Sequence, residues 1–186
     1  MSRLPAAKRE DLTPEHQQIW DRIHATRSGG GGPYSMLMHS PAMAQHFAAT
    51  EDYFRTQSLL PDADREIMIL AAARELDARY AWSRHEIRAQ KLGVRSEIIE
   101  ALRAKAPIER FTGPQRLLVE FTRRLVHDHT VSDELFARME SAYGRAKFLE
   151  AIGLLELSQL PSDLAPGRFA LAIAQLGEQV TKKKRR

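Results

Sequence analysis

The feature that most constrains this chain is an unbroken apolar run at residues 67–73, with the sequence IMILAAA. Glu66 precedes the run and Arg74 follows it. A helix with no polar face over this length is buried on all sides, so the run predicts a central core helix. A second helical segment follows at residues 78–92, and Gly93 is its predicted C-terminal cap.

Two polar side chains of this region become neighbours only if the chain turns back on itself. Glu66 and His85 are nineteen positions apart, which is about 28 Å along an unbroken helix. Asp77 is the predicted break, because aspartate is unfavourable inside helices and caps the helix that follows. We therefore predict a helix, a kink at residues 76–77 and a second helix, with Glu66 in contact with His85.

The rest of the chain shows helical patterns as well. No segment of useful length alternates apolar and polar residues with the period of two that strands need. The sequence therefore predicts an all-α bundle of about eight or nine helices. Three parts are expected: an N-terminal helical arm with a glycine-rich linker (1–35), a helical domain (36–177) and a basic disordered tail (178–186). The glycines lack the Lys-Ser/Thr of a phosphate-binding loop, which favours a linker.

Charge and cysteine content exclude several classes of function. The formal net charge is +4, and five positive charges lie in the tail at residues 182–186, so the remaining chain is near neutral. We therefore expect no nucleic-acid partner. The tail matches either a solvated chain end or a polyanion-binding patch. The chain has no cysteine, and it shows neither a signal-peptide pattern nor a membrane-length apolar run, so we expect a cytoplasmic protein without a membrane partner.

An ordered set of motifs surrounds the central helix pair. It comprises Leu-Pro-x-x-x-Arg-Glu ending at Glu66, Tyr-x-Trp-x-x-His ending at His85, Ala-x-x-x-Gly ending at Gly93, an Ile-x-x-Leu helix, and an earlier His39-Ser-Pro. This set resembles the carboxymuconolactone decarboxylase family, which shares its fold with the alkylhydroperoxidase D-like proteins. The resemblance covers residues 36–175 and is strongest over residues 60–102.

The resemblance implies a helical bundle of the alkylhydroperoxidase D-like type that assembles as a dimer, trimer or hexamer. It also implies a cofactor-free lyase of aromatic catabolism, acting on a small unsaturated or cyclic carboxylic acid by decarboxylation, lactone opening or isomerisation. One departure matters. The peroxidase branch carries Cys-x-x-Cys where this chain has Ala78 and Ala81. Thiol peroxidase chemistry needs a thiolate, so we do not expect it here.

Three residues are the catalytic candidates. His85 is a candidate general acid or base, because imidazole titrates near neutral pH. Glu66 either orients His85 or carries the proton itself, and the resemblance places Tyr80 where it would donate a hydrogen bond to substrate. The alternative interpretation is structural: His85 is a satisfied histidine between helices, and Glu66 is an acid favoured near a helix N-terminus.

Four further residues are substrate-binding candidates. Arg79 and Arg84 would hold a carboxylate by a bidentate fork, although a solvated helix face explains them equally well. Trp82 is expected to pack beside the pocket, and the resemblance places His39 in its lining. No third ligand accompanies Glu66 and His85, so we predict neither metal nor cofactor.

A second class of function stays open, namely a non-catalytic helical oligomer or a small-molecule binding module. The enzyme hypothesis predicts that Glu66 and His85 converge beside a ligand-sized cavity. The binding hypothesis predicts that His85 packs in a filled core. The remaining histidines near a helix end, His127 and His129, are expected to face solvent.

Overall fold

The computed structural model describes residues 5–27 and 33–159 of the 186-residue chain. These residues form helices and no strands, which confirms the all-α prediction. The helices are η1 (Arg9–Asp11), α1 (Pro14–Ala25), α2 (Tyr34–Leu37), α3 (Pro41–Thr56), α4 (Asp62–Glu75), α5 (Arg79–Lys91), α6 (Ser96–Arg103), η2 (Ile108–Arg110), α7 (Gly113–Asp128) and α8 (Asp133–Gln159). The central glycines of the linker, the helix expected at residues 169–177 and the basic tail lie outside the described residues.

The described residues divide into two units, 5–57 (without 28–32) and 58–159. The domain boundary predicted after residue 35 falls inside the first unit, and the division into domains stays a prediction. In the first unit, α1, α2 and α3 bury a small core around Ile19, Ile23, Met38 and Ala44. Thr13 accepts a hydrogen bond from the His16 amide, and Pro14 begins α1, as expected of a capped helix start.

The buried side chain of Arg27 connects the two sides of the glycine-rich segment in the first unit. The Arg27 guanidinium contacts the carboxylates of Glu51 and Asp52 at 3.2 and 2.9 Å. It also lies over the Tyr34 ring, whose hydroxyl donates to Glu51 at 2.6 Å. Burial, followed by the nearby Glu51 charge, raises the pKa of Tyr34. These contacts fasten α3 to the residues on both sides of the segment.

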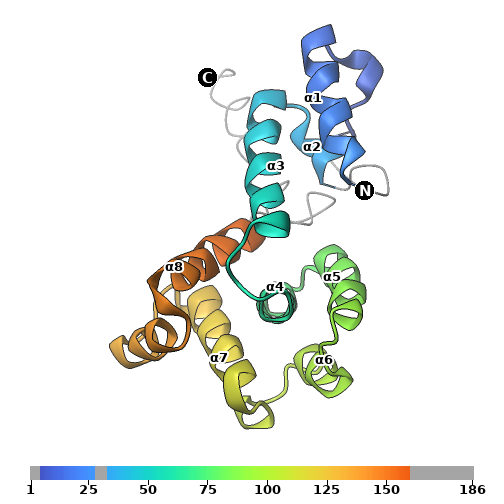
Figure 1. The fold of residues 1–186 in the computed structure, drawn as a ribbon. Helices are drawn as coiled ribbons and strands as arrows, with labels where there is room; N and C mark the ends of the chain where they lie inside the picture. Colours follow the sequence, from blue (N-terminus) through green and yellow to red (C-terminus); the bar gives the residue numbers. More distant parts are fainter. Residues whose placement is uncertain (1–4, 28–32, 160–186) are drawn as a thin grey trace, which may run out of the picture. The chain divides into compact units, whose positions relative to one another are not determined.

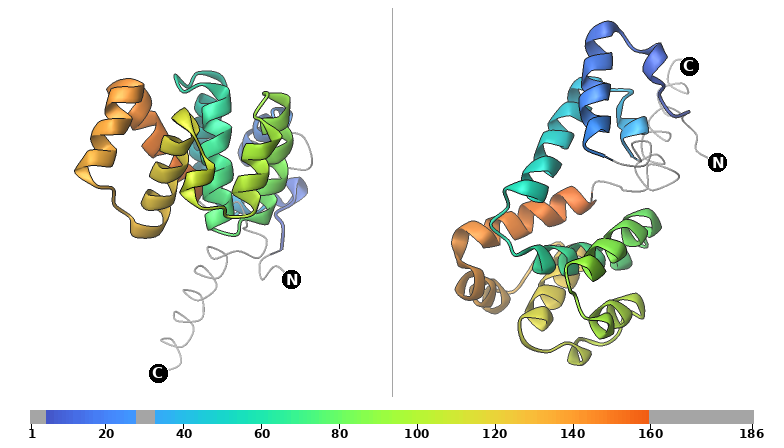
Figure 2. Two further views of the ribbon diagram at one scale, coloured as in Figure 1. Left: turned by 90° about the horizontal axis from the view of Figure 1, so that it is seen from below. Right: turned by 45° about the vertical axis from the view of Figure 1, so that its right-hand side comes forward.

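The second unit is built around α4, which contacts α5, α6, α7 and α8. Figure 1 shows α4 nearly end-on, between α5 and α7, and Figure 2 shows the same order from two further directions. Six residues of the apolar run are buried, and Ile69 is half-buried. The prediction of a central core helix is therefore confirmed for this unit, because neighbouring helices cover almost every side of α4.

The predicted break between α4 and α5 is present, but Asp77 produces it by a different mechanism. Asp77 has a φ of 53° in the left-handed region, and its side chain does not cap α5. Its amide bonds the Arg74 carbonyl at 3.4 Å, and the next amide, of Ala78, bonds the Ala73 carbonyl at 2.8 Å. This pattern ends α4 in a Schellman motif, in which aspartate is one of the few residue types that tolerate the left-handed position. The capping prediction was wrong because aspartate is common both as the N-cap of a helix and in the left-handed position after a helix, and residue type alone does not distinguish the two.

The same motif recurs at two later helix ends. Gly93 and Lys105 have φ values of 79° and 49° and follow α5 and α6. Gly93 thus confirms the predicted C-cap, whereas Lys105 occupies a left-handed position that favours glycine. Gly144 interrupts α8 with non-helical backbone angles and divides it into two helical pieces. Within the part of the chain that the structure describes, no helix has the length and apolar character needed to cross a membrane.

Candidate functional site

The Glu66 carboxylate and the His85 imidazole meet across the turn between α4 and α5. His85 Nδ1 lies 2.7 Å from Glu66 Oε2, which confirms the predicted contact. Glu66 belongs to the second turn of α4, where the helix dipole favours a negative charge. An ionised carboxylate only accepts hydrogen bonds, so Nδ1 is the donor and Nε2 is left as the second reactive nitrogen of the ring.

Arg88 is the second partner of this carboxylate, and sequence reasoning missed it. Its Nε lies 3.2 Å from Glu66 Oε1, opposite the oxygen that His85 contacts. His85 and Arg88 are three positions apart on α5 and therefore share one face of that helix. The i, i+3 spacing of His85 and Arg88 was the available signal for this contact. However, α5 carries three arginines, and nothing in the sequence distinguishes Arg88 from the other two.

The three side chains differ sharply in exposure. The Glu66 side chain is 1% exposed, whereas those of His85 and Arg88 are 29% and 35% exposed. A buried carboxylate is tolerated when charged and hydrogen-bonding groups surround it. The arrangement thus places an oriented imidazole and a guanidinium at the surface, above a fully enclosed negative charge.

A tyrosine from α8 contacts the same end of α4. The Tyr143 hydroxyl donates to Asp64 Oδ2 at 2.9 Å. Burial, followed by the Asp64 charge, raises the pKa of Tyr143. The neighbouring Arg65 is 3% exposed and bonds the Leu60 carbonyl and the Asp62 side chain. Polar contacts on both residues that precede Glu66 therefore hold the N-terminal part of α4 in a defined position.

The other predicted residues of α5 lie on several sides of that helix. Tyr80 is 40% exposed, and Arg79 and Arg84 are exposed as well. The Trp82 indole donates to Glu86 at 2.7 Å, and the Arg103 guanidinium lies 5.7 Å from its ring centroid. Trp82 is thus held by contacts with α5 and α6, and a role for it in binding substrate stays a prediction.

His39 belongs to the first unit, outside the helix pair that carries Glu66 and His85. Its Nε2 lies 2.8 Å from the Pro5 carbonyl oxygen. Pro41 begins α3, but the Ser40 side chain makes no capping hydrogen bond. The placement of His39 in the lining of a substrate pocket stays a prediction.

A second carboxylate cluster lies at the other end of α4 and was also missed. Glu75 contacts Arg123 Nε at 3.0 Å and His127 Nε2 at 2.8 Å, and Lys105 approaches to 3.9 Å. His127 is half-exposed, as expected, but it is paired with a carboxylate fifty-two positions away rather than only solvated. The signal was the i, i+4 spacing of Arg123 and His127, opposite an acid at the end of the core helix.

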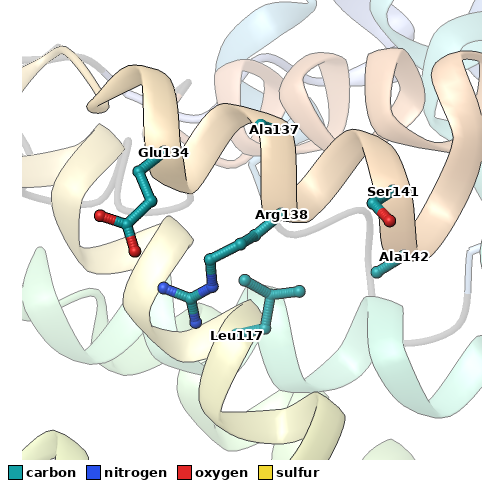
Figure 3. A pocket seen from close by; sticks show the side chains of 6 residues that line it. All are labelled: Leu117, Glu134, Ala137, Arg138, Ser141 and Ala142. Carbon is teal, nitrogen blue, oxygen red and sulfur yellow. The ribbon is translucent and has the colours of Figure 1, made fainter.

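A shallow depression of about 480 Å³ opens between α7 and α8, away from both clusters. Figure 3 shows Arg138 of α8 reaching over Leu117 of α7, with Ser141 and Ala142 further along α8. Arg138 also pairs with Glu120 at 3.1 Å. The residues lining this depression are Leu117, Glu134, Ala137, Arg138, Ser141 and Ala142, so the Glu66–His85 pair is not part of it.

Among the described residues, no three histidine, aspartate or glutamate side chains come together as ligands of one metal ion would. No model of a known protein family matches this chain, and no curated protein matches its sequence. The resemblance to the carboxymuconolactone decarboxylase family therefore stays a prediction, carried by the motifs around Glu66 and His85.

Proposed function

We propose that this protein is a cofactor-free proton-transfer enzyme, similar to carboxymuconolactone decarboxylase, that acts on a small unsaturated or cyclic carboxylic acid. The observation that carries the proposal is the contact between the buried Glu66 carboxylate and the half-exposed His85 imidazole. A carboxylate bonded to one ring nitrogen fixes the tautomer and stabilises the imidazolium that forms during proton transfer. His85 Nε2 is the proton-transferring atom in this proposal.

The same parts serve the three reactions that the resemblance implies. In isomerisation, Nε2 removes a proton from carbon and returns it to a conjugated carbon, which moves the double bond. In decarboxylation, the C–C bond to the carboxylate breaks, its electrons form an enolate, and protonated His85 supplies the proton that replaces CO₂. In lactone opening, Nε2 takes a proton from the water that attacks the carbonyl carbon, and it returns this proton to the ring oxygen when the bond from that oxygen to the carbonyl carbon breaks. Each reaction needs a cation near the developing negative charge, and arginines of α5 supply it.

Sulfur chemistry does not belong to this proposal. The positions that resemble the peroxidase cysteines are Ala78 and Ala81, and the chain contains no cysteine. A thiolate is the nucleophile in every step of thiol–disulfide exchange. We also propose that the protein is cytoplasmic, as its lack of cysteine suggests, and that it assembles as a homo-oligomer, as the resemblance implies.

A second candidate function is a non-catalytic small-molecule binding module. The depression between α7 and α8 is the region that such a module would use, although it is shallow and open whereas most ligand sites are enclosed. In this case the Glu66–His85 pair would be a structural contact. The two proposals differ in where a ligand would bind: beside the Glu66–His85 pair for the enzyme, or in the depression between α7 and α8 for the binding module.

Turnover of a panel of unsaturated acids and lactones, followed by NMR of the products, tests the proposal. His85→Ala should lower turnover by at least about 100-fold, which is the lower range for general acid–base catalysis. His127→Ala is the matched control, because it removes an imidazole from the other carboxylate of α4. Unchanged turnover in His85→Ala, or equal loss in both variants, would exclude the proton-transfer role of His85.

A further inference from the structure

Glu66 holds two side chains of α5 next to each other at the surface. His85 Nδ1 contacts Oε2 at 2.7 Å, and Arg88 Nε contacts Oε1 at 3.2 Å. Because one enclosed carboxylate anchors both groups, their outward-facing atoms have a defined separation before any ligand arrives. Such preorganisation lowers the entropic cost of binding.

Arg88 retains donors that Glu66 does not use. A guanidinium carries five N–H donors in a planar fork, and the contact with Glu66 is made through Nε. Among the described residues, the two terminal nitrogens of Arg88 have no hydrogen-bond partner, and the side chain is 35% exposed. With these two nitrogens available, the guanidinium can donate two parallel hydrogen bonds to a second carboxylate.

The charges favour an anion at this position. The negative charge of Glu66 is 1% exposed, so a ligand approaching from solvent first meets Arg88 and the imidazole. The other arginine candidates of α5 are placed differently. Arg79 lies six positions before His85, which puts it about 9 Å away along the helix axis and on another side of the helix.

We propose that Arg88 binds the carboxylate of the substrate and presents its adjacent carbon to His85 Nε2. The inference rests on the proposed proton-transfer function and narrows it to substrates with a free carboxylate close to the reacting carbon. Arg88 replaces Arg79 as the carboxylate-binding residue. Glu66 acts on both groups and is a positioning residue.

The test is a binding titration of the full chain that needs no turnover. Sodium benzoate is the anionic probe and benzamide its uncharged counterpart, and binding is followed by the ¹⁵N chemical shifts of the His85 ring. In the unmodified protein, benzoate should shift the His85 signals and benzamide should not. Arg88→Gln should raise the Kd for benzoate at least about tenfold, the effect of losing a charge-assisted hydrogen bond.

Two matched controls lie further along the chain, at the end of α5 and just before α6. Lys91→Gln and Arg95→Gln remove the same charge from exposed positions and should change the Kd less than about threefold. Arg88→Lys keeps the charge but loses the fork, so its Kd should lie between those of the unmodified protein and Arg88→Gln. If Arg88→Gln does not fold, as judged by circular dichroism, Arg88→Lys decides the question.

Four results would overturn the inference: no shift of His85 by millimolar benzoate, equal affinity for benzamide, an unchanged Kd when Arg88 is replaced, or an equal loss in either control. Its failure is distinguishable from failure of the proposed function. If His85→Ala abolishes turnover but replacing Arg88 leaves the Kd for benzoate unchanged, only this inference is wrong. If benzoate binds at Arg88 while His85→Ala keeps full turnover, the proton-transfer function is wrong.

Discussion

The two ends of α4 each carry a glutamate that contacts a histidine and an arginine, yet the two clusters answer different physical needs. Glu75 is the last residue of α4, where the helix dipole disfavours a negative charge, and two cations and a histidine surround it. Its histidine, His127, lies in the last turn of α7, where the dipole favours a basic residue. The Glu75 cluster is therefore explained by stability alone.

The Glu66 cluster is not explained by helix electrostatics in the same way. Glu66 lies in the second turn of α4 and His85 lies in the middle of α5, away from the helix ends where the dipole acts most strongly. The Glu66 side chain is 1% exposed and that of Glu75 is 7% exposed, so both carboxylates depend on their partners to offset the loss of solvation. The difference teaches that the helix dipole accounts for the cluster at one end of α4, whereas the cluster at the other end has a different reason, either a contact that ties α5 to α4 or the proposed proton transfer.

The largest expected effect concerns the free energy of unfolding. Glu66→Ala should lower it by about 3–4 kcal/mol, because the change leaves a cavity and removes the enclosed carboxylate that Arg88 and the His85 ring contact. Glu75→Ala should cost less, about 1–2 kcal/mol, because its partner His127 is 54% exposed and because removing an acid from the C-terminal end of α4 relieves an unfavourable interaction with the helix dipole. Urea unfolding followed by circular dichroism measures both. Equal losses would remove the contrast between the two ends.

The next effect concerns turnover, and it separates the role of Glu66 in orienting the His85 ring from its role in stability. Glu66→Gln keeps the shape of the side chain but removes the charge that fixes the His85 tautomer, so turnover should fall by about 10- to 100-fold. Glu75→Gln should leave turnover within about twofold, because no reacting group contacts it. The measurement is kcat on the substrate found in the panel. Full turnover in Glu66→Gln would assign Glu66 a purely structural role.

Alkaline pH should destabilise the Glu66 end through Tyr143. The pKa of this tyrosine is raised in the folded state, above the value of about 10 for an exposed tyrosine. Its contribution to stability is therefore complete below about pH 10 and decreases as the pH rises, by up to about 1.4 kcal/mol per pH unit. Tyr143→Phe should be less stable at neutral pH but should show a shallower decrease above about pH 10. Parallel stability curves from urea titrations at several pH values would contradict this.

The smallest effect concerns the backbone at the Glu75 end. Lys105 adopts a φ of 49°, a position in which a non-glycine residue costs about 1 kcal/mol. Lys105→Gly should therefore raise the free energy of unfolding by about 0.5–1 kcal/mol, since the two ion pairs it loses, with Glu75 and Asp77, are long, at 3.9 and 3.8 Å. Asp77→Gly is the matched control and should gain less, because aspartate tolerates this conformation and bonds Arg74. Thermal melts rank the two variants, and a loss of stability in Lys105→Gly would show that its ion pairs outweigh the strain.

Much of the fold was predictable because it depends on local spacing. The apolar run at residues 67–73 identified the core helix, and Gly93 marked the end of α5 at which the structure places it. The contact between Glu66 and His85 was also predictable, since a single turn between two adjacent helices leaves few arrangements. The role of Asp77 was mispredicted, because residue type alone does not distinguish a left-handed C-terminal position from a capping position.

The amino-acid sequence by itself determined that this protein is all-helical in its described part, that α4 is its most buried helix and that thiol chemistry is absent. These properties depend on side-chain periodicity and on which atoms the chain contains. Only the tertiary structure decided that Arg88 shares Glu66 with His85, and that Arg123 and His127 neutralise Glu75. The physical reason is that a charge selects its partner by proximity after the helices have packed, and many arginines of this chain have a suitable charge while few come within reach of an enclosed carboxylate.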